Sequence, residues 1–441
     1  GRGSNDQAVF PPTPPLIKVR PRERPHLPES TPEPGKRRPR RIVPYPPVFR
    51  YPDLRYLWLS TLLSAPGFMG ETVILGWLLL KLTDSPLVVS FGLGIRFAPA
   101  LVSGVLGGAL ADRMDRRQLL VITSLGMAVA GASLGVLVLV DWIEVWQLLA
   151  ITFIGGGMMT LQQVARQSFT FDVVGPSEVV GGLAFISLGQ RIGGGLGALA
   201  LGYVVGTFGV DVAYLTLAVC NVISVVPLLF IRSRGQAAPI SRQPVWQNLK
   251  EFAVEIRRNK PLLTVFLLVA VVEMLGFSYM TILPSLARDV LKVGAGGLGV
   301  LTSVLSAGGL FALVLLSVLG ETKRKGLSWL IAVGALGLSL VFLGVSSTFA
   351  LALLAMALVS GMAALSDVFS QSLMQMAVPN ELRGRAMGAW TMAIGTMPLG
   401  AVAIGGLATA IGVSPAVVIS GLAAAALAVG SFVLLPGLRR S

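Results

Sequence analysis

The sequence predicts an all-α integral membrane protein with about twelve transmembrane helices, arranged as two parallel six-helix repeats. Three observations support this fold class. The chain of 441 residues is 54% hydrophobic and only 13% charged, whereas soluble domains carry about 25% charged residues. Its apolar residues form long unbroken runs, which argue against the short alternating segments of a β-barrel. A stretch of the second half also resembles a stretch of the first.

The apolar runs divide into twelve predicted spans. Each is long enough, at about 1.5 Å per residue, to cross the roughly 30 Å of hydrocarbon in a bilayer. The predicted spans are 54–80, 86–110, 118–140, 146–168, 178–206, 211–232, 261–287, 296–319, 327–345, 349–375, 384–408 and 413–436.

Two polar segments divide the chain into domains. Residues 1–52 are rich in Pro and Arg, so we expect a disordered cytoplasmic tail that is either solvated or bound to anionic lipid headgroups. Residues 233–260 are predicted to be a cytoplasmic linker between an N-terminal half, 53–232, and a C-terminal half, 261–441. An apolar face opposite a basic face predicts an interfacial amphipathic helix in this linker. These faces are formed by Val245, Leu249, Phe252 and Ile256, and by Lys250, Arg257 and Arg258.

The basic residues predict the orientation. If the N-terminus is cytoplasmic, 30 of the 35 Lys and Arg residues lie in cytoplasmic segments. The outer loops then hold only Lys81, Arg288 and Lys292, while Arg96 and Arg191 lie within spans. Because cytoplasmic loops are enriched in Lys and Arg, both termini are predicted to be cytoplasmic. The net charge of +14 thus reflects topology, and no nucleic-acid partner is expected.

An internal repeat relates the two halves. Residues 166–184 resemble residues 370–387 after a gap of one residue. Both stretches contain Gln-Ser and Pro-x-Glu, and spaced glycines follow at an offset of 203 residues. The glycine pairs are Gly181 with Gly384, Gly197 with Gly400, Gly202 with Gly405, and Gly209 with Gly412. Spans 4 and 5 therefore repeat as spans 10 and 11, which predicts parallel repeats about an axis along the membrane normal.

Composition excludes several kinds of site. Cys220 is the only cysteine and His26 the only histidine, so internal disulfides, Cys/His metal sites and His-based catalytic triads are excluded. No phosphate-binding Gly-x-x-x-x-Gly-Lys-Ser/Thr loop occurs, which excludes ATP-driven transport by this chain alone. We expect no enzyme activity, no metal and no cofactor.

The loop between spans 2 and 3 carries the most specific motif. A glycine is followed by an Asp-Arg pair four and five residues later and then by a basic pair, namely Gly108, Asp112, Arg113, Arg116 and Arg117. This pattern resembles the signature loop of the major facilitator superfamily, although Asp115 stands where many members have Gly. The resemblance implies a cytoplasmic gate, in which we include Arg166 of span 4. The alternative is an ordinary basic cytoplasmic loop.

Two further stretches narrow the resemblance. Residues 54–86 and 383–413 are similar to the bacterial transmembrane secretion effector branch, which is the branch of enterobactin exporters. The resemblance extends over about 54–436. It implies a multi-pass protein of the bacterial cytoplasmic membrane that moves a small molecule between two six-helix halves.

Span 5 carries a stripe of small residues. Gly189, Gly193 and Gly197 follow each other at intervals of four and permit close helix contact. Antiporters of the superfamily have a Gly-Pro motif here, but Gly194 stands where Pro is expected. We expect the stripe to pack at the interface between the halves.

Charged residues inside the hydrocarbon are costly and mark candidate functional positions. Four lie near the middle of their spans: Glu71, Arg96, Arg191 and Glu273. Asp367 lies nearer the cytoplasmic end of span 10, and its repeat counterpart is Gln163. In one hypothesis Glu71 or Glu273 binds a proton that substrate displaces. In the other, two acids and two arginines form a central cluster that neutralises itself and holds the helices together.

These observations predict a secondary active transporter that exports a small amphipathic or hydrophobic molecule, siderophore-like or drug-like, by alternating access coupled to protons. The expected partners are that molecule, protons and membrane lipids, and the expected state is a monomer. Two alternatives remain at this stage. One is a flippase of the same fold for lipids or lysolipids. The other is a receptor or scaffold that acts through its basic tail without transporting.

Overall fold

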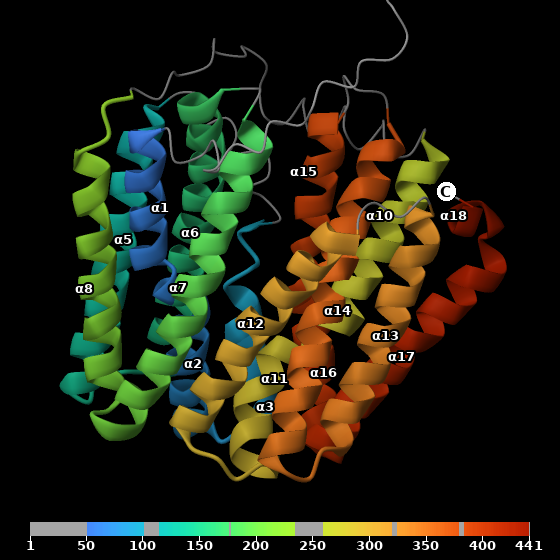
Figure 1. The fold of residues 1–441 in the computed structure, drawn as a ribbon. Coiled ribbons are helices and arrows are strands. Elements are labelled where there is room, and N and C mark those ends of the chain that lie inside the picture. Colours follow the sequence, from blue (N-terminus) through green and yellow to red (C-terminus); the bar gives the residue numbers. More distant parts are fainter. Residues whose placement is uncertain are drawn as a thin grey trace, which may run out of the picture. The chain divides into compact units, whose positions relative to one another are not determined.

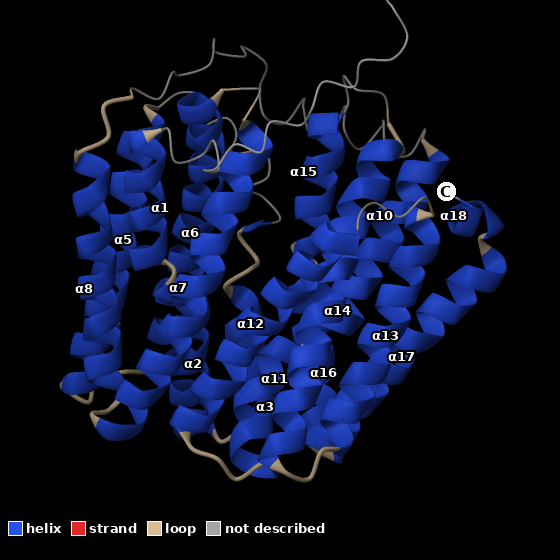
Figure 2. Cartoon of the chain, in the orientation of Figure 1, coloured by secondary structure: helices blue, strands red, loops and turns tan. Residues whose placement is uncertain are grey.

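The computed structural model describes residues 51–100, 114–175, 178–233, 259–319, 324–378 and 383–440. The predicted tail, the predicted amphipathic linker helix and three residues of the signature loop, Gly108, Asp112 and Arg113, lie outside these residues. Within the described residues all regular structure is helical (Figures 1 and 2). The predicted all-α membrane fold is confirmed, and the described part of the chain contains eleven helical stretches long and apolar enough to span a bilayer.

The N-terminal half contains five of these stretches and one shorter apolar helix. The first stretch consists of two helices that meet at Pro66. The shorter helix, α3, begins the predicted span 2. The helices are α1 (Pro52–Ser64), α2 (Pro66–Thr83), α3 (Pro86–Ile95), α5 (Arg116–Leu139), α6 (Val145–Val174), α7 (Val179–Thr207) and α8 (Val210–Leu229).

The C-terminal half contains the other six stretches. Its first stretch alternates α-helix with two π-helical turns, η2 and η3. Its fifth is interrupted between α15 and α16. The elements are α10 (Lys260–Val272), η2 (Glu273–Phe277), α11 (Tyr279–Ser285), η3 (Leu286–Val290), α12 (Ala295–Leu319), α13 (Lys325–Val345), α14 (Phe349–Met376), α15 (Arg383–Ile394), α16 (Met397–Ile411), α17 (Val413–Leu434) and the short α18 (Pro436–Arg440).

Local sequence explains where the helices begin. The side chain of Asp115 accepts hydrogen bonds from the first backbone N–H groups of α5, and Asn259 does the same for α10. Pro66 begins α2 and has no N–H to donate to the Leu62 carbonyl, which breaks the first span. Large apolar side chains such as Phe311, which is 71% exposed, cover the outside of the bundle, as expected for a surface in contact with lipid.

The repeated glycines occupy equivalent positions in the two halves. Gly209 and Gly412, which precede α8 and α17, have φ angles of +105° and +94°, which only glycine adopts readily. Gly202 of α7 packs against Gly299 of α12. Its counterpart Gly405 of α16 packs against Ser90 of α3. Each half therefore places the fifth span of its own repeat against the second span of the other, as parallel repeats require.

Helices alternate between two ends of the bundle. We call the end with the turns at 84–85, 208–209, 291–294 and 412 the lower end, because it is the lower end in Figure 1. In the predicted orientation the lower end is the outer side of the membrane. The contacts of Gly202 with Gly299 and of Gly405 with Ser90 belong to the lower parts of their helices.

Candidate functional site

Arg96 and Glu71 form an ion pair inside the N-terminal half. Arg96 ends α3, and its Nη2 lies 2.8 Å from Oε2 of Glu71 on α2. The Arg96 side chain is 1% exposed and the Glu71 side chain 13%. The guanidinium also donates to the carbonyls of Gly67 and Phe68 and to Oγ1 of Thr72. Arg96 therefore binds one turn of α2 through a carboxylate, a hydroxyl and two carbonyls.

A glycine on a third helix permits this arrangement. A Cβ on Gly156 of α6 would overlap the backbone carbonyl of Arg96, so any other residue would force α6 away from the end of α3. Tyr214 of α8 is fully buried, and the charges of Glu71 and Arg96 both act on it. The pair is thus enclosed by α2, α3, α6 and α8, all of them helices of one half.

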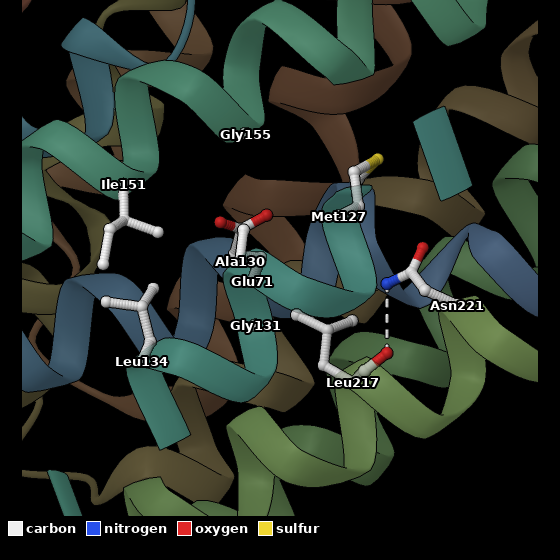
Figure 3. A pocket seen from close by; sticks show the side chains of 9 residues that line it. All are labelled: Glu71, Met127, Ala130, Gly131, Leu134, Ile151, Gly155, Leu217 and Asn221. Atoms are coloured by element: carbon white, nitrogen blue, oxygen red, sulfur yellow. Dashed lines mark hydrogen bonds between the residues drawn. The ribbon is translucent and has the colours of Figure 1, made fainter. Parts of the chain in front are cut away.

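A pocket opens beside this pair (Figure 3). Glu71 and Asn221 are its polar lining residues. The remaining lining is apolar or glycine and comes from α5, α6 and α8, namely Met127, Ala130, Gly131, Leu134, Ile151, Gly155 and Leu217. The side-chain amide of Asn221 donates to the Leu217 carbonyl over 3.0 Å, and Figure 3 shows its oxygen on the other side of the amide. The pocket lies within the N-terminal half rather than between the halves.

Arg166 is held by neutral groups. Its Nη2 lies 3.0 Å from Ser64 Oγ and 2.9 Å from Gln162 Oε1, and the Gln162 amide donates in turn to Ser124 Oγ. Arg166 is buried, and within the described residues no carboxylate lies within ion-pair distance of it. It connects α6 to α1, and through Gln162 to α5.

The other two described arginines of the predicted gate, Arg116 and Arg117, also contact their own half. Arg116 pairs with Asp172 of α6 and donates to the Ser168 carbonyl. Arg117 donates to the carbonyls of Leu229 and Ile231 at the end of α8, where a cation complements the helix dipole. In this structure these arginines therefore join α5 to α6 and to α8.

Three further charges come together from the two halves. Arg191 of α7 and Asp367 of α14 lie close enough for their charges to interact, and Asp367 interacts likewise with Glu273 at the start of η2. Glu273 is buried, and it begins a π-helical turn, a distortion that often marks functional positions. We call Arg191, Glu273 and Asp367 the inter-half charge cluster.

Because Gly309 of α12 has no side chain, it leaves room for the guanidinium of Arg191. A Cβ on Gly309 would overlap Nη1 of Arg191 and would lie 3.2 Å from Oγ of Ser360 on α14. The guanidinium therefore lies over a gap in the surface of α12 that only glycine leaves. Gln163, the repeat counterpart of Asp367, instead accepts a hydrogen bond of 2.7 Å from Gln190, the neighbour of Arg191.

The structure thus divides the predicted four-residue cluster. Glu71 and Arg96 pair with each other inside the N-terminal half. Arg191 and Glu273 belong to a second group that includes Asp367. The partners of these four residues thus differ from a simple pairing of two arginines with two glutamates, and the reason is geometric. The position of a residue along its span gives its depth in the membrane but not the side of the helix on which it lies.

The predicted glycine stripe of span 5 also needs a correction. Side chains at Gly189, Gly193 and Gly197 would overlap Trp58, Leu62 and Pro66, which belong to α1 and α2 of the same half. The stripe therefore packs inside the N-terminal half. Gly193 lies against the carbonyl of Leu62, which receives no helical hydrogen bond from Pro66 because proline has no N–H. A different face of α7, formed by Gly195 and Gly202, packs against α12 of the other half.

Sequence reasoning did not identify an ion pair at the lower end. Arg288 of η3 lies 2.6 Å from Asp84, in the turn between α2 and α3, and donates to the Leu80 carbonyl. It also pairs with Asp289 beside it. The pair joins the two halves. The available signal was that Arg288 is one of only three basic residues in the predicted outer loops.

We expect Arg288→Gln to change the rate at which the lower end opens by less than about fivefold, because exposed ion pairs contribute only about 0–1 kcal/mol. The expected direction is faster opening of the lower end. The measurement is the rate at which a charged thiol reagent labels Ala295→Cys, in a chain carrying Cys220→Ser. The charge exchange Asp84→Arg with Arg288→Asp should restore the slower labelling. Equal labelling rates in all three chains would contradict a gating role for the pair.

The comparisons with known proteins place the chain in a family. A family model described as transmembrane secretion effector matches residues 43–439. The chain belongs to this family. The predicted resemblance to the major facilitator superfamily, and to this branch of it, is confirmed. The chain is therefore a multi-pass membrane transporter of the major facilitator type.

Two relatives are named as transporters. The chain is 26% identical to the multidrug efflux pump Tap of Mycolicibacterium fortuitum over 373 residues, which are 81% of this chain and 89% of that pump. It is 23% identical to the Staphyloferrin A transporter of Staphylococcus aureus over 266 residues. That alignment covers 59% of this chain and 66% of the relative, just under two thirds of its length.

Solved transporter structures share the fold. A peptide transporter POT in complex with sulfate aligns with a TM-score of 0.72 at 15% identity, over 88% of this chain and 95% of the other. The nucleoside transporter NupG aligns with a TM-score of 0.71 at 14% identity, over 87% and 98%. At such identities the likeness concerns the fold alone.

Proposed function

We propose that the protein exports a small amphipathic or hydrophobic molecule by alternating access, and that protons moving inward drive this export. The secretion effector family and the efflux pump among its relatives support the direction. The siderophore transporter and the multidrug pump support a small-molecule substrate. The predicted excess of basic residues on the side opposite the lower end supports cytoplasmic termini in a bacterial cytoplasmic membrane.

The observation that carries proton coupling is the inter-half charge cluster. Arg191 belongs to the N-terminal half, while Asp367 and Glu273 belong to the C-terminal half. A proton on Asp367 would remove its attraction for Arg191, and this attraction is stronger in a poorly polar interior than in water. Protonation would therefore weaken a link between the halves, which is the coupling that alternating access needs.

The packing between the halves supports movement about that link. Gly202 with Gly299, and Gly405 with Ser90, bring backbones together through small residues rather than through interlocking large side chains. Contacts of this kind involve little side-chain interdigitation, so the halves can tilt against each other. Arg116 and Arg117 would keep the upper part of the N-terminal half rigid while it tilts.

We expect Asp367→Asn to abolish transport driven by a pH gradient while retaining downhill transport, because the amide cannot exchange a proton. The measurement is uptake of ethidium, and of a catecholate siderophore, into everted vesicles with an acidic lumen. Asp141→Asn, which removes an exposed carboxylate in a turn, is the matched control and should behave as the native chain. Gradient-driven uptake by Asp367→Asn at the native rate would contradict the proposed coupling.

A further inference from the structure

The pocket beside Glu71 is separate from the inter-half charge cluster. Its lining comes from α2, α5, α6 and α8, all of them helices of the N-terminal half. The inter-half charge cluster comes from α7, η2 and α14. A group bound in the pocket would therefore act on Glu71 without entering the contact between the halves.

Buried polar atoms around the pocket have no partner within the described part of the chain. Asn221 is 1% exposed, and its Oδ1 accepts no hydrogen bond although the residue lines the pocket. The hydroxyl of the fully buried Tyr214 is also without a partner, as is Nε of Arg96. A buried polar group left in this condition costs about 1–3 kcal/mol, which a bound water removes.

The pocket also has room on the side of these groups. Gly155 of α6 lines it, and a Cβ built on Gly155 would meet nothing within 4 Å. Glu71 is bound to Arg96 through Oε2, and its carboxylate keeps the residual exposure that lets it line the pocket. Water in this space would find acceptors on Glu71 and Asn221, the polar residues of the lining, and a buried water typically has about two to four polar partners.

We propose that this pocket is a hydrated proton-access site for Glu71. Water in the pocket hydrogen-bonds to the Glu71 carboxylate and to Asn221, and connects Glu71 to the aqueous phase through the N-terminal half. When Glu71 is protonated, a carboxylate oxygen takes a proton from a hydronium ion and leaves a water molecule. The reverse step returns that proton to water. Arg96 remains charged throughout, with Gly67, Phe68 and Thr72 still accepting its hydrogen bonds.

The surroundings of Glu71 agree with this role. Arg96 at the end of α3 pairs with Glu71, and the charges of both residues act on Tyr214 of α8. The pocket residues of α5 and α6 carry no charge. On the α7 side, α2 packs through Gly70 against Gly197 and Leu201, which are also uncharged. Water in the pocket would therefore offer a route by which a proton reaches Glu71.

Hydration is tested by thiol labelling and does not depend on transport. We use Gly155→Cys in a chain with Cys220→Ser, reconstituted into liposomes, and add a positively charged methanethiosulfonate reagent. Because only the thiolate reacts, and thiolates form in water, the expected labelling is at least about tenfold faster than that of Gly406→Cys. Gly406 is the matched control, since it is a half-buried helical glycine whose Cβ would also meet nothing within 4 Å and which does not line the pocket.

Equal labelling rates at the two positions, with both thiols reacting fully after denaturation, would overturn the hydrated pocket. If Gly155→Cys fails to fold, Ala130→Cys tests the same lining from α5. Labelling by lipid-soluble N-ethylmaleimide alone would also overturn the proposal, because it would show a dry pocket in contact with lipid.

Proton access is tested by a second measurement. The C=O stretching band of protonated Glu71, recorded at acidic pH and identified by its loss in Glu71→Gln, should shift in D2O in the native chain. Gly155→Leu fills the pocket and should slow this exchange at least about tenfold, whereas Gly406→Leu should leave it unchanged. An unchanged rate in Gly155→Leu would overturn the route. The use of this route in transport rests on the proposed function, but both measurements are made without substrate, so the two ideas can fail separately.

Discussion

Replacing Gly309 by alanine is expected to lower gradient-driven transport by roughly tenfold without unfolding the protein. The new Cβ would overlap Nη1 of Arg191, which is the far end of a flexible side chain and can move away. At an effective dielectric constant of about 20, a displacement of a few ångström weakens the attraction between two unit charges by about 1 kcal/mol, which is on the order of a tenfold change in rate. The measurement is uptake into everted vesicles under an imposed pH gradient.

The control for this prediction is Gly334→Ala in α13. There the new Cβ would lie 3.6 Å from Ala428, an ordinary contact, so transport should stay at the native rate. Thermal unfolding should be similar in both variants, because alanine is favoured over glycine in helices. If Gly309→Ala transports as fast as Gly334→Ala under the same gradient, the position of the Arg191 guanidinium does not matter for coupling.

Replacing Arg96 by methionine is expected to destabilise the N-terminal half by about 3–5 kcal/mol, because the Glu71 carboxylate is then left without its partner in a largely buried site. Methionine fills a similar volume but supplies no donor for Glu71 or for the carbonyls of Gly67 and Phe68. The measurement is thermal unfolding followed with a thiol-reactive dye. The native chain suits this assay, since Cys220 of α8 is its single cysteine and is partly buried.

Two further variants test whether the loss of stability comes from the unpaired buried carboxylate or from the removal of any arginine charge. The double variant Glu71→Gln with Arg96→Met should lose less stability than Arg96→Met alone, because no unpaired carboxylate remains. Arg288→Met breaks a partly exposed pair and should change stability by no more than about 1 kcal/mol. If the double variant is as unstable as Arg96→Met, the hydrogen bonds of Arg96 to the α2 backbone dominate its contribution.

Much of the fold could be predicted because the bilayer imposes simple demands on sequence. A span needs about 20 mostly apolar residues, and a repeat built on matching backbone needs matching glycines. Gly209 and Gly412 illustrate this, since both take positive φ angles and both were paired by sequence alone. The break between α1 and α2 within the predicted span 1 was not predicted, because Pro66 is tolerated in a transmembrane span and does not interrupt its hydropathy.

For the candidate site, the sequence predicted which charged residues belong to it but not how they pair. Intramembrane charges are rare, so Glu71, Arg96, Arg191 and Glu273 were identifiable as costly residues. Their partners were not, because partners depend on rotation about each helix axis. Arg288 was missed as a site residue, since a basic residue near the end of a span is ordinary until Asp84 is seen beside it.

The sequence by itself determined that this chain is a membrane protein and that it folds as two related helical halves. It also identified the charged residues whose burial in the membrane carries a large desolvation penalty. Hydropathy, basic residues and spaced glycines carry that information locally along the chain. Only the tertiary structure decided that Glu71 pairs with Arg96 within one half, while the charge of Arg191 interacts with that of Asp367 in the other. The physical reason is that burying a charge demands a partner, but close packing of helices at positions such as Gly156 and Gly309 selects which one.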